Sequence, residues 1–328
     1  MKVAVVILNW NGKQLLEQFL PSVVAYSQDA DIYVADNAST DDSVSFVKAN
    51  FPSVYVIQNK VNGGYAKGYN DALRQIKADA FCLLNSDVEV TEHWLQPIIS
   101  TFDKYPNIAI IQPKLLDYKR RDYYEYAGAA GGFIDKYGYP YCRGRIFDTV
   151  ERDEDQYNDA DIFWASGACL FIRSHIFQQL NGFDESFFAH MEEIDVCWRV
   201  HNLGYAIRYV QDCVVYHVGG ATLKNSNPKK TFLNFRNSLF TLTKNAGGNL
   251  FSLILVRLLL DGLAALKFLI EFKFFHILAI LKAHFSFYSH LPRLLKQRKQ
   301  LENSYNYYQI SSIVWTYFVR KRKEFNCL

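Results

Sequence analysis

The first ninety residues alternate between short apolar runs and stretches with helical spacing, and this alternation limits the possible folds of the chain more than any other feature. Apolar runs rich in β-branched residues predict strands at 3–8, 31–35, 54–58 and 81–84. Helical spacing predicts helices at 14–26, 42–49 and 68–76. Strands and helices that alternate in this way form right-handed βαβ units. The sequence therefore predicts an α/β fold with a mostly parallel sheet and flanking helices.

Polar side chains follow three of these predicted strands. Asn9 and Asn11 come after the first strand, Asp36 after the second, and Asn85 and Asp87 after the fourth. In parallel sheets, ligands bind at the carboxyl ends of the strands. We therefore expect these side chains to meet at one edge of the sheet and to form a binding site there.

The middle of the chain is less regular. Residues 118–161 mix Tyr, Gly and charged residues without a clear period, which predicts loops and short strands that help to shape an acceptor side. Periodic structure returns at 162–172 and 174–180, and a helix is expected to run to about residue 203. A last strand, at 206–210 or 213–216, leads to His217.

A glycine-rich turn precedes the third predicted helix. It contains Asn62, Gly63, Gly64 and Lys67. Exposed backbone N–H groups at a helix N-terminus, together with a lysine, suit a diphosphate, although glycine turns are common without any ligand. The segment lacks the glycine spacings of dinucleotide-binding and Walker-type loops, so those sites are disfavoured.

Two carboxylate positions suggest separate chemical roles. Asp36 can accept hydrogen bonds from a nucleobase imide or a ribose hydroxyl, although the segment that follows it also suits helix capping. Asn85 and Asp87 are two residues apart on one strand end and so point to the same side. A carboxylate such as Asp87 is a hard ligand for Mg²⁺ or Mn²⁺, and the alternative is a simple Asn/Asp turn. A lone histidine such as His217 is usually structural.

Three carboxylates are clustered at Glu192, Glu193 and Asp195. Mutual repulsion raises the pKa of at least one carboxyl in such a cluster, which suits a general base. The same residues would also suit the first turn of a helix, where the macrodipole favours negative charge. The segment alone leaves both interpretations open.

Charge and cysteine content narrow the class of protein. The 328 residues carry a formal net charge of +3, so no nucleic-acid partner is implied. The six cysteines form no CxxC pair, and we expect them to be reduced core residues of a protein on the cytosolic side. The first apolar run has no cleavage site and is predicted to be a buried strand rather than a signal peptide.

The composition changes after about residue 249, and we expect a catalytic domain at 1–245 and a helical segment, at the membrane interface or packed on the protein, at 246–328. Residues 250–281 are strongly apolar, with no charge-free run of the roughly 18–20 residues that a spanning helix needs. At about 100° per residue, five charged residues share one sector of a helix and Lys273 lies outside it. The five are Arg257, Asp261, Lys267, Glu271 and Lys282. This favours a helix or hairpin in the membrane interface, the alternative being a face that covers the catalytic domain or a partner subunit.

Taken together, these segments resemble the family 2 glycosyltransferases of the GT-A fold, especially the bacterial rhamnosyltransferase-like branch. The resemblance covers roughly the first 220 residues and rests on motifs in the correct order. They are 5–11 (VVILNWN), 36–41 (DNASTD), Asn59 with 62–70 (NGGYAKGYN), 83–87 (LLNSD), 166–168 (SGA), 182–185 (GFDE) and 192–195 (EEID).

The resemblance implies a role for each matching residue. Asn9, Asn11 and Asp36 would hold the nucleoside, and Lys67, on the turn of Asn62, Gly63 and Gly64, would lie near the base or diphosphate. Asn85 and Asp87 occupy the DxD positions, so Asp87 would bind the metal, and His217 would be a further ligand. Glu193 would be the base, with Asp195 as a rival. Gly167, Ala168, Phe183 and Asp184 would lie on the acceptor side. The chain departs from the family pattern where Asn85 replaces the first DxD aspartate and Glu193 the usual aspartate.

The implied activity is an inverting transfer of a sugar from dTDP-rhamnose or a UDP-sugar to an acceptor hydroxyl, with Mg²⁺ or Mn²⁺. The acceptor is expected to be a glycan or a polyprenyl-diphosphate-linked glycan of cell-surface polysaccharide assembly. The enzyme would then be cytoplasmic and peripheral on the inner face of the cytoplasmic membrane. The alternatives are a nucleotidyltransferase and an inactive membrane-attached binding protein. The first would require a glycine- and lysine/arginine-rich segment where 9–12 (NWNG) stands.

Overall fold

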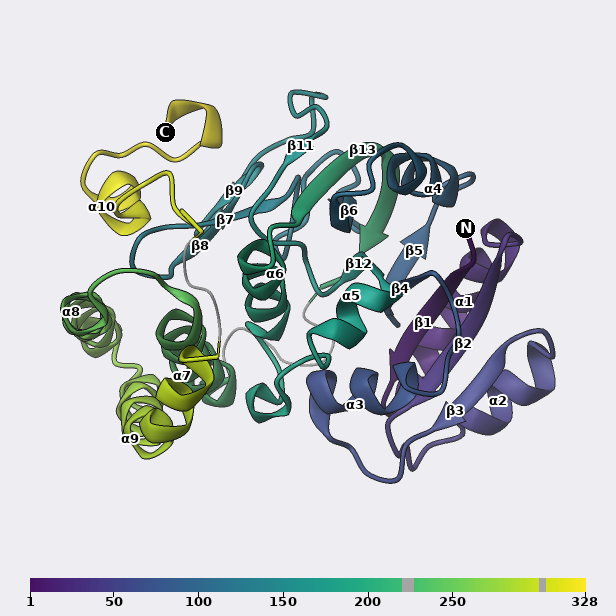
Figure 1. The fold of residues 1–328 in the computed structure, drawn as a ribbon, viewed down its shortest axis with the longest axis horizontal. Coiled ribbons are helices and arrows are strands. Elements are labelled where there is room, and N and C mark those ends of the chain that lie inside the picture. Colours follow the sequence, from purple (N-terminus) through teal and green to yellow (C-terminus); the bar gives the residue numbers. More distant parts are fainter. Residues whose placement is uncertain (220–226, 301–304) are drawn as a thin grey trace.

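The computed structural model describes residues 1–219, 227–300 and 305–328. Its centre is a nine-stranded sheet in the order β11-β13-β6-β12-β4-β1-β2-β3, with β5 paired to β13 (Figure 1). Two apolar cores cover the two faces of this sheet. One contains residues of α1, α2 and α4, and the other contains residues of α3, α5 and α6. The predicted α/β fold is confirmed.

The strands of the central sheet are β1 (Val3–Asn9), β2 (Ala30–Asp36), β3 (Tyr55–Gln58), β4 (Ala80–Asn85), β5 (Val88–Val90), β6 (Ile108–Asp117), β11 (Ala160–Asp161), β12 (Cys169–Arg173) and β13 (Ala206–His217). A second, four-stranded sheet holds β7 (Gly132–Ile134), β8 (Pro140–Cys142), β9 (Arg145–Ile146) and β10 (Thr149–Val150). The expected short strands within 118–161 are therefore present.

The helices are α1 (Lys13–Tyr26), α2 (Ser43–Asn50), α3 (Gly64–Leu73), α4 (Leu95–Lys104), α5 (Ser174–Gln179), α6 (Glu192–Asn202), α7 (Pro228–Asn245), α8 (Leu250–Ile270), α9 (Phe274–Arg298) and α10 (Ile313–Phe318), with 3₁₀ turns at Glu185–Phe187 and Phe325–Cys327. The helix predicted at 68–76 begins four residues earlier, because its N-terminal turn is formed by the glycines. The two candidate final strands form one continuous strand, β13.

Strand direction brings the predicted polar side chains to one edge. β3, β2, β1 and β4 are parallel neighbours. β12 runs antiparallel to both β4 and β6, and β6 is parallel to β13. The six longer strands other than β12 therefore point the same way, and their carboxyl ends share one edge of the sheet.

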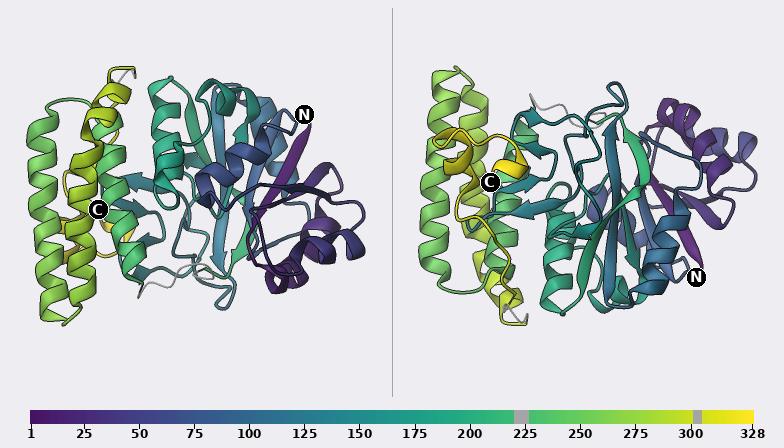
Figure 2. Two further views of the ribbon diagram at one scale, coloured as in Figure 1. Left: turned by 90° about the horizontal axis from the view of Figure 1, so that it is seen from below. Right: turned by 90° about the horizontal axis from the view of Figure 1, so that it is seen from above.

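The C-terminal helices form a hairpin beside the second sheet. α8 and α9 stand side by side at the end of the molecule away from β1–β3, and α9 also packs along α7 (Figure 2). Among the described residues, no helix is long and apolar enough to cross a membrane. Because α7 contacts both α6 and α9, it links the body to the hairpin. The division of the chain at residues 245 and 246 stays a proposal.

Two sets of side chains bear on the expectations drawn from the sequence. Arg257 and Asp261, two of the five charged residues that share one sector of the hairpin, are 2% and 0% exposed and point into the protein. Their pairing with each other, at 2.8 Å, and with groups of the second sheet makes that burial possible. Five cysteines are buried as expected, whereas Cys327 is exposed near the C-terminus.

Candidate active site

The sheet register places the nucleoside-side residues next to one another. Asn9 at the end of β1 lies opposite Asp36 at the end of β2, and Leu8 lies opposite Asn85 at the end of β4. Three of the predicted positions thus come from three adjacent strands, as the pattern of polar residues after the strands had predicted.

The corner formed by β1 and β2 is buried and built from polar side chains. The Asn9 side-chain amide donates to Asp36 Oδ1 at 3.2 Å, and the Ser39 N–H donates to Asp36 Oδ2 at 3.0 Å. Asn9 Oδ1 is buried without a hydrogen-bond partner among the described residues. Asn11 Oδ1 accepts from the Thr40 N–H at 2.7 Å and so holds the loop after β2, and its contact with a nucleoside stays a prediction.

The glycine turn is fixed by a local polar network and by one close backbone contact. Asn62 Oδ1 accepts from the Gly64 N–H at 2.9 Å and from the Asn37 side chain at 3.0 Å. Gly64 has a φ of 77°, and a Cβ at this position would lie 2.3 Å from the Phe188 carbonyl oxygen. Only glycine tolerates that approach. Gly63 forms the cap of the same helix, α3.

Lys67 points toward carboxylates of its own surroundings. Its Nζ lies 2.8 Å from Asp71 and 3.8 Å from Glu185. The hydrogen bond to Asp71 raises the pKa of Lys67, and the negative charges of Asp71 and Glu185 add to this effect. The placement of Lys67 near a base or diphosphate stays a prediction.

The end of β13 meets the turn after β4 in a buried cluster. His217 Nε2 lies 3.1 Å from Asp87 Oδ1 and 3.5 Å from the side-chain nitrogen of Asn85, and His217 Nδ1 lies 3.2 Å from Glu125 Oε1. Burial alone would lower the pKa of His217, but the carboxylates of Glu125 and Asp87 outweigh it and raise that pKa to about 10. Without a metal, the two carboxylates therefore favour the protonated form of His217, and a metal ion on Nε2 would replace that proton.

The same geometry suits a divalent metal. Two ligands at right angles, each about 2.1 Å from one ion, lie about 3.0 Å apart, and Asp87 Oδ1 and His217 Nε2 are separated by 3.1 Å. Glu125 on the other ring nitrogen matches the carboxylate–histidine–metal arrangement that fixes the tautomer of a ligand. Within the described ranges, no group of three His, Cys, Asp or Glu side chains is arranged as a complete metal site. Donor phosphate oxygens and water would have to complete the coordination.

The carboxylates at the start of α6 separate into two environments. Burial raises the pKa of Glu193 to about 7, and it raises that of Glu192 well above its ordinary value, with the charge of Glu193 adding to the effect. One oxygen of each, Oε2, is buried without a partner among the described residues. Asp195 is instead 0% exposed, and its oxygens accept from Arg199, Lys244 and Asn245 at 2.9, 3.0 and 2.9 Å.

The segment that leads into α6 is held in an unusual conformation. Phe188, His190 and Met191 all have positive φ, at 65°, 69° and 73°. Asn237 of α7 donates to the carbonyls of Phe187 and His190 at 3.0 and 2.7 Å. Non-glycine residues persist in this region only where the surroundings enforce it. Helix α7 therefore fixes the segment that carries Glu193.

The predicted acceptor-side residues fall into two groups. The Gly167 carbonyl accepts from the Tyr65 hydroxyl at 2.8 Å, and the Ala168 carbonyl accepts from the Asn85 N–H at 2.9 Å, so both lie beside the metal-side cluster. Phe183 is packed in the core. Asp184 pairs with Lys244 at 2.8 Å.

Tyr65 connects these groups to the carboxylates of α6. Its pKa is raised well above the ordinary value by burial and, to a smaller extent, by the charges of Glu192 and Glu193. Because Tyr65 also contacts Gly167, it lies between the carboxylates of α6 and the end of β4. Side chains from β1, β2, β4, β13 and α6 thus gather around one edge of the sheet.

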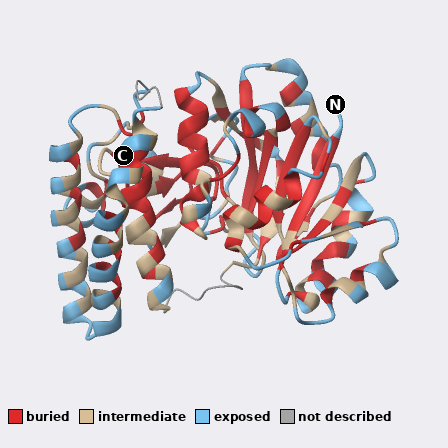
Figure 3. Ribbon diagram, turned by 60° about the horizontal axis from the view of Figure 1, so that its bottom comes forward, coloured by how far each residue is buried: buried red, intermediate tan, exposed pale blue. Residues whose placement is uncertain are grey.

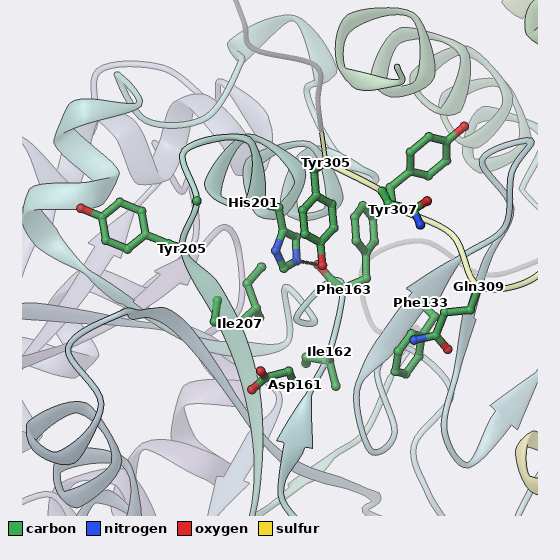
Figure 4. Close-up of a pocket in the computed structure, with 13 residues that line it drawn as sticks. Phe133, Asp161, Ile162, Phe163, His201, Tyr205, Ile207, Tyr305, Tyr307 and Gln309 are labelled. Atoms are coloured by element: carbon green, nitrogen blue, oxygen red, sulfur yellow. Dashed lines mark hydrogen bonds between the residues drawn. The ribbon is translucent and has the colours of Figure 1, made fainter. Parts of the chain in front are cut away.

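A cavity of about 330 Å³ lies elsewhere (Figure 4). Its lining includes Ala206 and Ile207, at the amino end of β13, whereas the cluster around His217 is at the carboxyl end. His201 stacks between Phe163 and Tyr305, with ring centroids 5.2 and 4.4 Å away. This cavity is not part of the candidate active site.

Three residues of the site gave no signal in the sequence. Glu125 comes from the irregular stretch after β6, and Asn237 and Lys244 come from α7. Each acts on a residue more than 45 positions away, at 3.2, 2.7 and 3.0 Å from His217, His190 and Asp195. Only the folded chain brings such partners together.

Comparison with solved structures defines the class of fold. The chain aligns with GalNAc-T7 bound to UDP, GalNAc and Mn²⁺, with a TM-score of 0.58 and 17% identity, over 75% of this chain and 48% of that one. It therefore spans about half the length of GalNAc-T7. It also aligns with the mannosyltransferase PcManGT from Pyrobaculum calidifontis, solved with GDP-Man and Mn²⁺, with a TM-score of 0.53 and 13% identity, over 91% and 73%. These likenesses show the GT-A fold.

Sequence comparison then shows the family. The sequence model of "Glycosyl transferase family 2" matches residues 4–180, more than half of the chain, which therefore belongs to this glycosyltransferase family. It is 26% identical over 233 residues to the N-acetylglucosaminyl-diphospho-decaprenol L-rhamnosyltransferase of Mycobacterium tuberculosis, covering 65% of this chain and 75% of that protein. It is 23% identical over 242 residues to the low-salt glycan biosynthesis hexosyltransferase Agl10 of Haloferax volcanii, covering 72% and 73%.

Proposed function

We propose that the chain transfers a sugar, with inversion, from a nucleotide-diphosphate sugar to a hydroxyl of a lipid-linked glycan. One observation carries this proposal: the pair Asp87–His217, 3.1 Å apart, lies at the same sheet edge as the buried Asn9–Asp36 pair. A charged leaving group and a nucleoside can therefore be held side by side.

The donor is proposed to bind along this edge. Asn9 and Asp36 would offer an amide oxygen and a carboxylate to the nucleoside. The N-terminus of α3, at Gly63 and Gly64, would favour the negative charge of the diphosphate. Asp87 and His217 would hold Mg²⁺ or Mn²⁺, which, when bound, offsets the charge that develops on the diphosphate. The donor is proposed to be dTDP-rhamnose or a UDP-sugar.

Glu193 is proposed to be the general base. Its raised pKa, about 7, and its unpartnered Oε2 suit a group that takes a proton near neutral pH. As it removes the proton from the acceptor hydroxyl, that oxygen attacks the anomeric carbon on the face opposite the diphosphate. The bond from the anomeric carbon to the phosphate oxygen breaks, and the nucleoside diphosphate leaves with the electron pair. Asp195 is disfavoured as the base because Arg199, Lys244 and Asn245 occupy its oxygens.

The acceptor is proposed to be a glycan on a polyprenyl diphosphate, used in cell-surface polysaccharide assembly. The name of the mycobacterial relative describes an acceptor of that kind, N-acetylglucosaminyl-diphospho-decaprenol. The enzyme would then work as a peripheral protein on the inner face of the cytoplasmic membrane.

A thermal-shift screen tests the donor site. UDP-, dTDP- and GDP-sugars are added with and without Mn²⁺ to the wild type, to Asp36→Ala and to the exposed control Asp42→Ala. A fitting donor at 100 times its Kd stabilises the fold by about 2.7 kcal/mol, so a rise in Tm is expected in the wild type and in Asp42→Ala. Asp36→Ala is expected to lose most of that rise. No shift with any donor in the presence of Mn²⁺ would refute the proposed site.

A further inference from the structure

The hairpin of α8 and α9 presents apolar side chains away from the protein. On α8 they recur every three or four residues, at Phe251, Leu255, Leu259, Leu263, Leu266 and Ile270. On α9 they follow the same spacing, at Phe274, Leu278, Leu281, Phe285 and Tyr288. Phe251 and Phe285 are 78% and 75% exposed. We call these two stripes the outer face.

The orientation of the hairpin is fixed from within. Asp261 accepts hydrogen bonds from Arg257 at 2.8 Å and from the Tyr139 hydroxyl at 2.9 Å, and it lies 3.1 Å from His284 of α9. A buried, fully paired carboxylate of this kind cannot turn to solvent without leaving its partners unpaired. In Figure 3 the buried residues of α8 and α9 line the sides toward the body, and the outer sides are exposed or intermediate.

Basic residues border the outer face. Lys267 of α8 lies 5.8 Å from the ring of Phe318, so α10 stands beside the end of α8. The residues that follow α10, 320–323 (RKRK), are all exposed. Glu271, at the end of α8, is already paired with Lys273 at 2.7 Å and Lys267 at 3.8 Å. The border therefore carries an excess of positive charge.

We propose that the outer face and its basic border bind the surface of a bilayer that contains anionic phospholipid. Apolar side chains of amphipathic helices enter the boundary between head groups and acyl chains, and nearby lysines and arginines attract anionic head groups. This inference rests on the proposed function only in one respect: a lipid-linked acceptor requires the enzyme to work at a lipid surface. Two copies of the chain associating through this face would bring the two basic borders together, which electrostatic complementarity disfavours.

The hairpin also contacts a loop that the sequence placed on the acceptor side. Arg293 of α9 donates to the Ser186 hydroxyl at 2.8 Å, next to Asp184. Helix α9 therefore connects the surface proposed for the bilayer to this loop.

Vesicle co-sedimentation of the full chain tests this inference. Vesicles are made of phosphatidylcholine alone or with phosphatidylglycerol. The wild type is expected to bind the anionic vesicles at least tenfold more strongly. Leu259→Glu with Phe285→Glu is expected to weaken binding to both vesicles at least tenfold. Replacing all four residues of 320–323 by Gln is expected to remove the preference for phosphatidylglycerol, since each lost charge weakens attraction about fivefold.

The controls separate this result from the proposed function. Tyr55→Glu changes a large exposed residue on β3, 56% exposed and far from the hairpin, and is expected to bind vesicles like the wild type. Circular dichroism checks that each variant folds, and thermal shift with donor checks the site without turnover. The inference is overturned if the wild type binds neither kind of vesicle. It is also overturned if light scattering shows that the wild type is a dimer and that the Leu259→Glu/Phe285→Glu variant is a monomer. Neither result affects the donor site.

Discussion

The carboxyl edge of the sheet and the C-terminal hairpin both bury charged groups, but they satisfy them differently. At the edge, Glu193 Oε2 and Asn9 Oδ1 are buried without partners among the described residues. In the hairpin, Asp261 has a partner on each oxygen. A buried polar group without a partner costs about 1–3 kcal/mol. The unpartnered atoms at the edge therefore carry a free-energy cost that a bound ligand can remove, whereas the paired Asp261 of the hairpin carries no such cost.

The hairpin departs from the usual rules of folding in the opposite sense. Its buried Arg257–Asp261 pair is satisfied, and the apolar side chains of its outer face are the ones left in water. In both regions the feature that costs free energy is where we place a partner: a nucleotide sugar at the edge and a bilayer at the hairpin. Substitutions at the edge should therefore affect turnover, and substitutions inside the hairpin should affect stability.

Asp87→Ala gives the largest expected effect. Removal of this carboxylate leaves His217 as the one remaining member of the proposed ligand pair, and transfer is expected to fall at least about a thousandfold, the scale of several kcal/mol for a catalytic metal. Initial rates at increasing Mn²⁺ measure it, with the exposed Asp42→Ala as the matched control. Full turnover of Asp87→Ala at any Mn²⁺ concentration would show that the metal site is elsewhere.

Asp261→Ala is expected to act on the fold instead. It leaves Arg257 buried and unpaired, which costs about 3–5 kcal/mol, and it should lower Tm while the folded fraction keeps its turnover. Chemical denaturation measures the free energy of unfolding. Glu271→Ala removes a carboxylate from exposed ion pairs of the same hairpin and should cost less than about 1 kcal/mol. An equal loss in both variants would contradict a structural role for the buried pair.

Glu193→Gln tests the difference between two carboxylates on one helix. Loss of the base is expected to lower kcat about a hundred- to a thousandfold while donor binding is retained. Asp195→Asn is the matched comparison: it breaks contacts to Arg199 and Lys244, so its main effect should be a lower Tm. A larger kcat defect in Asp195→Asn than in Glu193→Gln, at equal folded fraction, would reverse the assignment.

Glu125→Gln should weaken metal binding without removing it. The carboxylate on His217 Nδ1 orients the ring, and loss of such a partner typically costs 10–100-fold in metal affinity. Mn²⁺ binding followed by electron paramagnetic resonance measures this without turnover. Asp153→Asn, at a buried lysine pair elsewhere, serves as the control. Unchanged Mn²⁺ affinity in Glu125→Gln would leave Glu125 with a packing role only.

Much of the edge was predictable from sequence because its residues follow strands directly. Asn9, Asp36, Asn85 and Asp87 are fixed by strand ends, and parallel strands bring those ends together. The choice between Glu193 and Asp195 was not predictable, because it depends on Lys244, 49 positions further along the chain.

The hairpin shows a second limit of sequence patterns. The helical periodicity placed Arg257 and Asp261 in one sector, but it left open whether that sector faces solvent or the protein. What decides the matter is Tyr139, 122 residues away, whose hydroxyl bonds Asp261. A periodicity gives the sides of a helix and leaves open which side faces the protein.

The pH dependence gives the smallest effect and links both readouts to one residue. Because burial holds the pKa of Glu193 near 7, the base is protonated below that pH, and kcat/KM should fall up to tenfold for each unit below 7. The folded pKa is above the ordinary value of about 4.3, so the folded state binds this proton more tightly than the unfolded chain. Stability is therefore lost as pH rises from about 4.3 to 7.

Glu193→Gln should remove that loss. Its free energy of unfolding is expected to be close to that of the wild type at pH 4 and to exceed it at pH 8 by a few kcal/mol, on the order of 3 kcal/mol. Denaturant titrations at both pH values measure this, and Asp42→Asn serves as an exposed control. The ionised form of Glu193 would lower the stability of the fold, and the same form would be the one that acts as the base. Its lack of a hydrogen-bond partner would then serve catalysis. If the difference in free energy of unfolding between Glu193→Gln and the wild type is the same at pH 4 and at pH 8, the pKa of Glu193 is not raised. The physical basis for Glu193 as the base would then be lost.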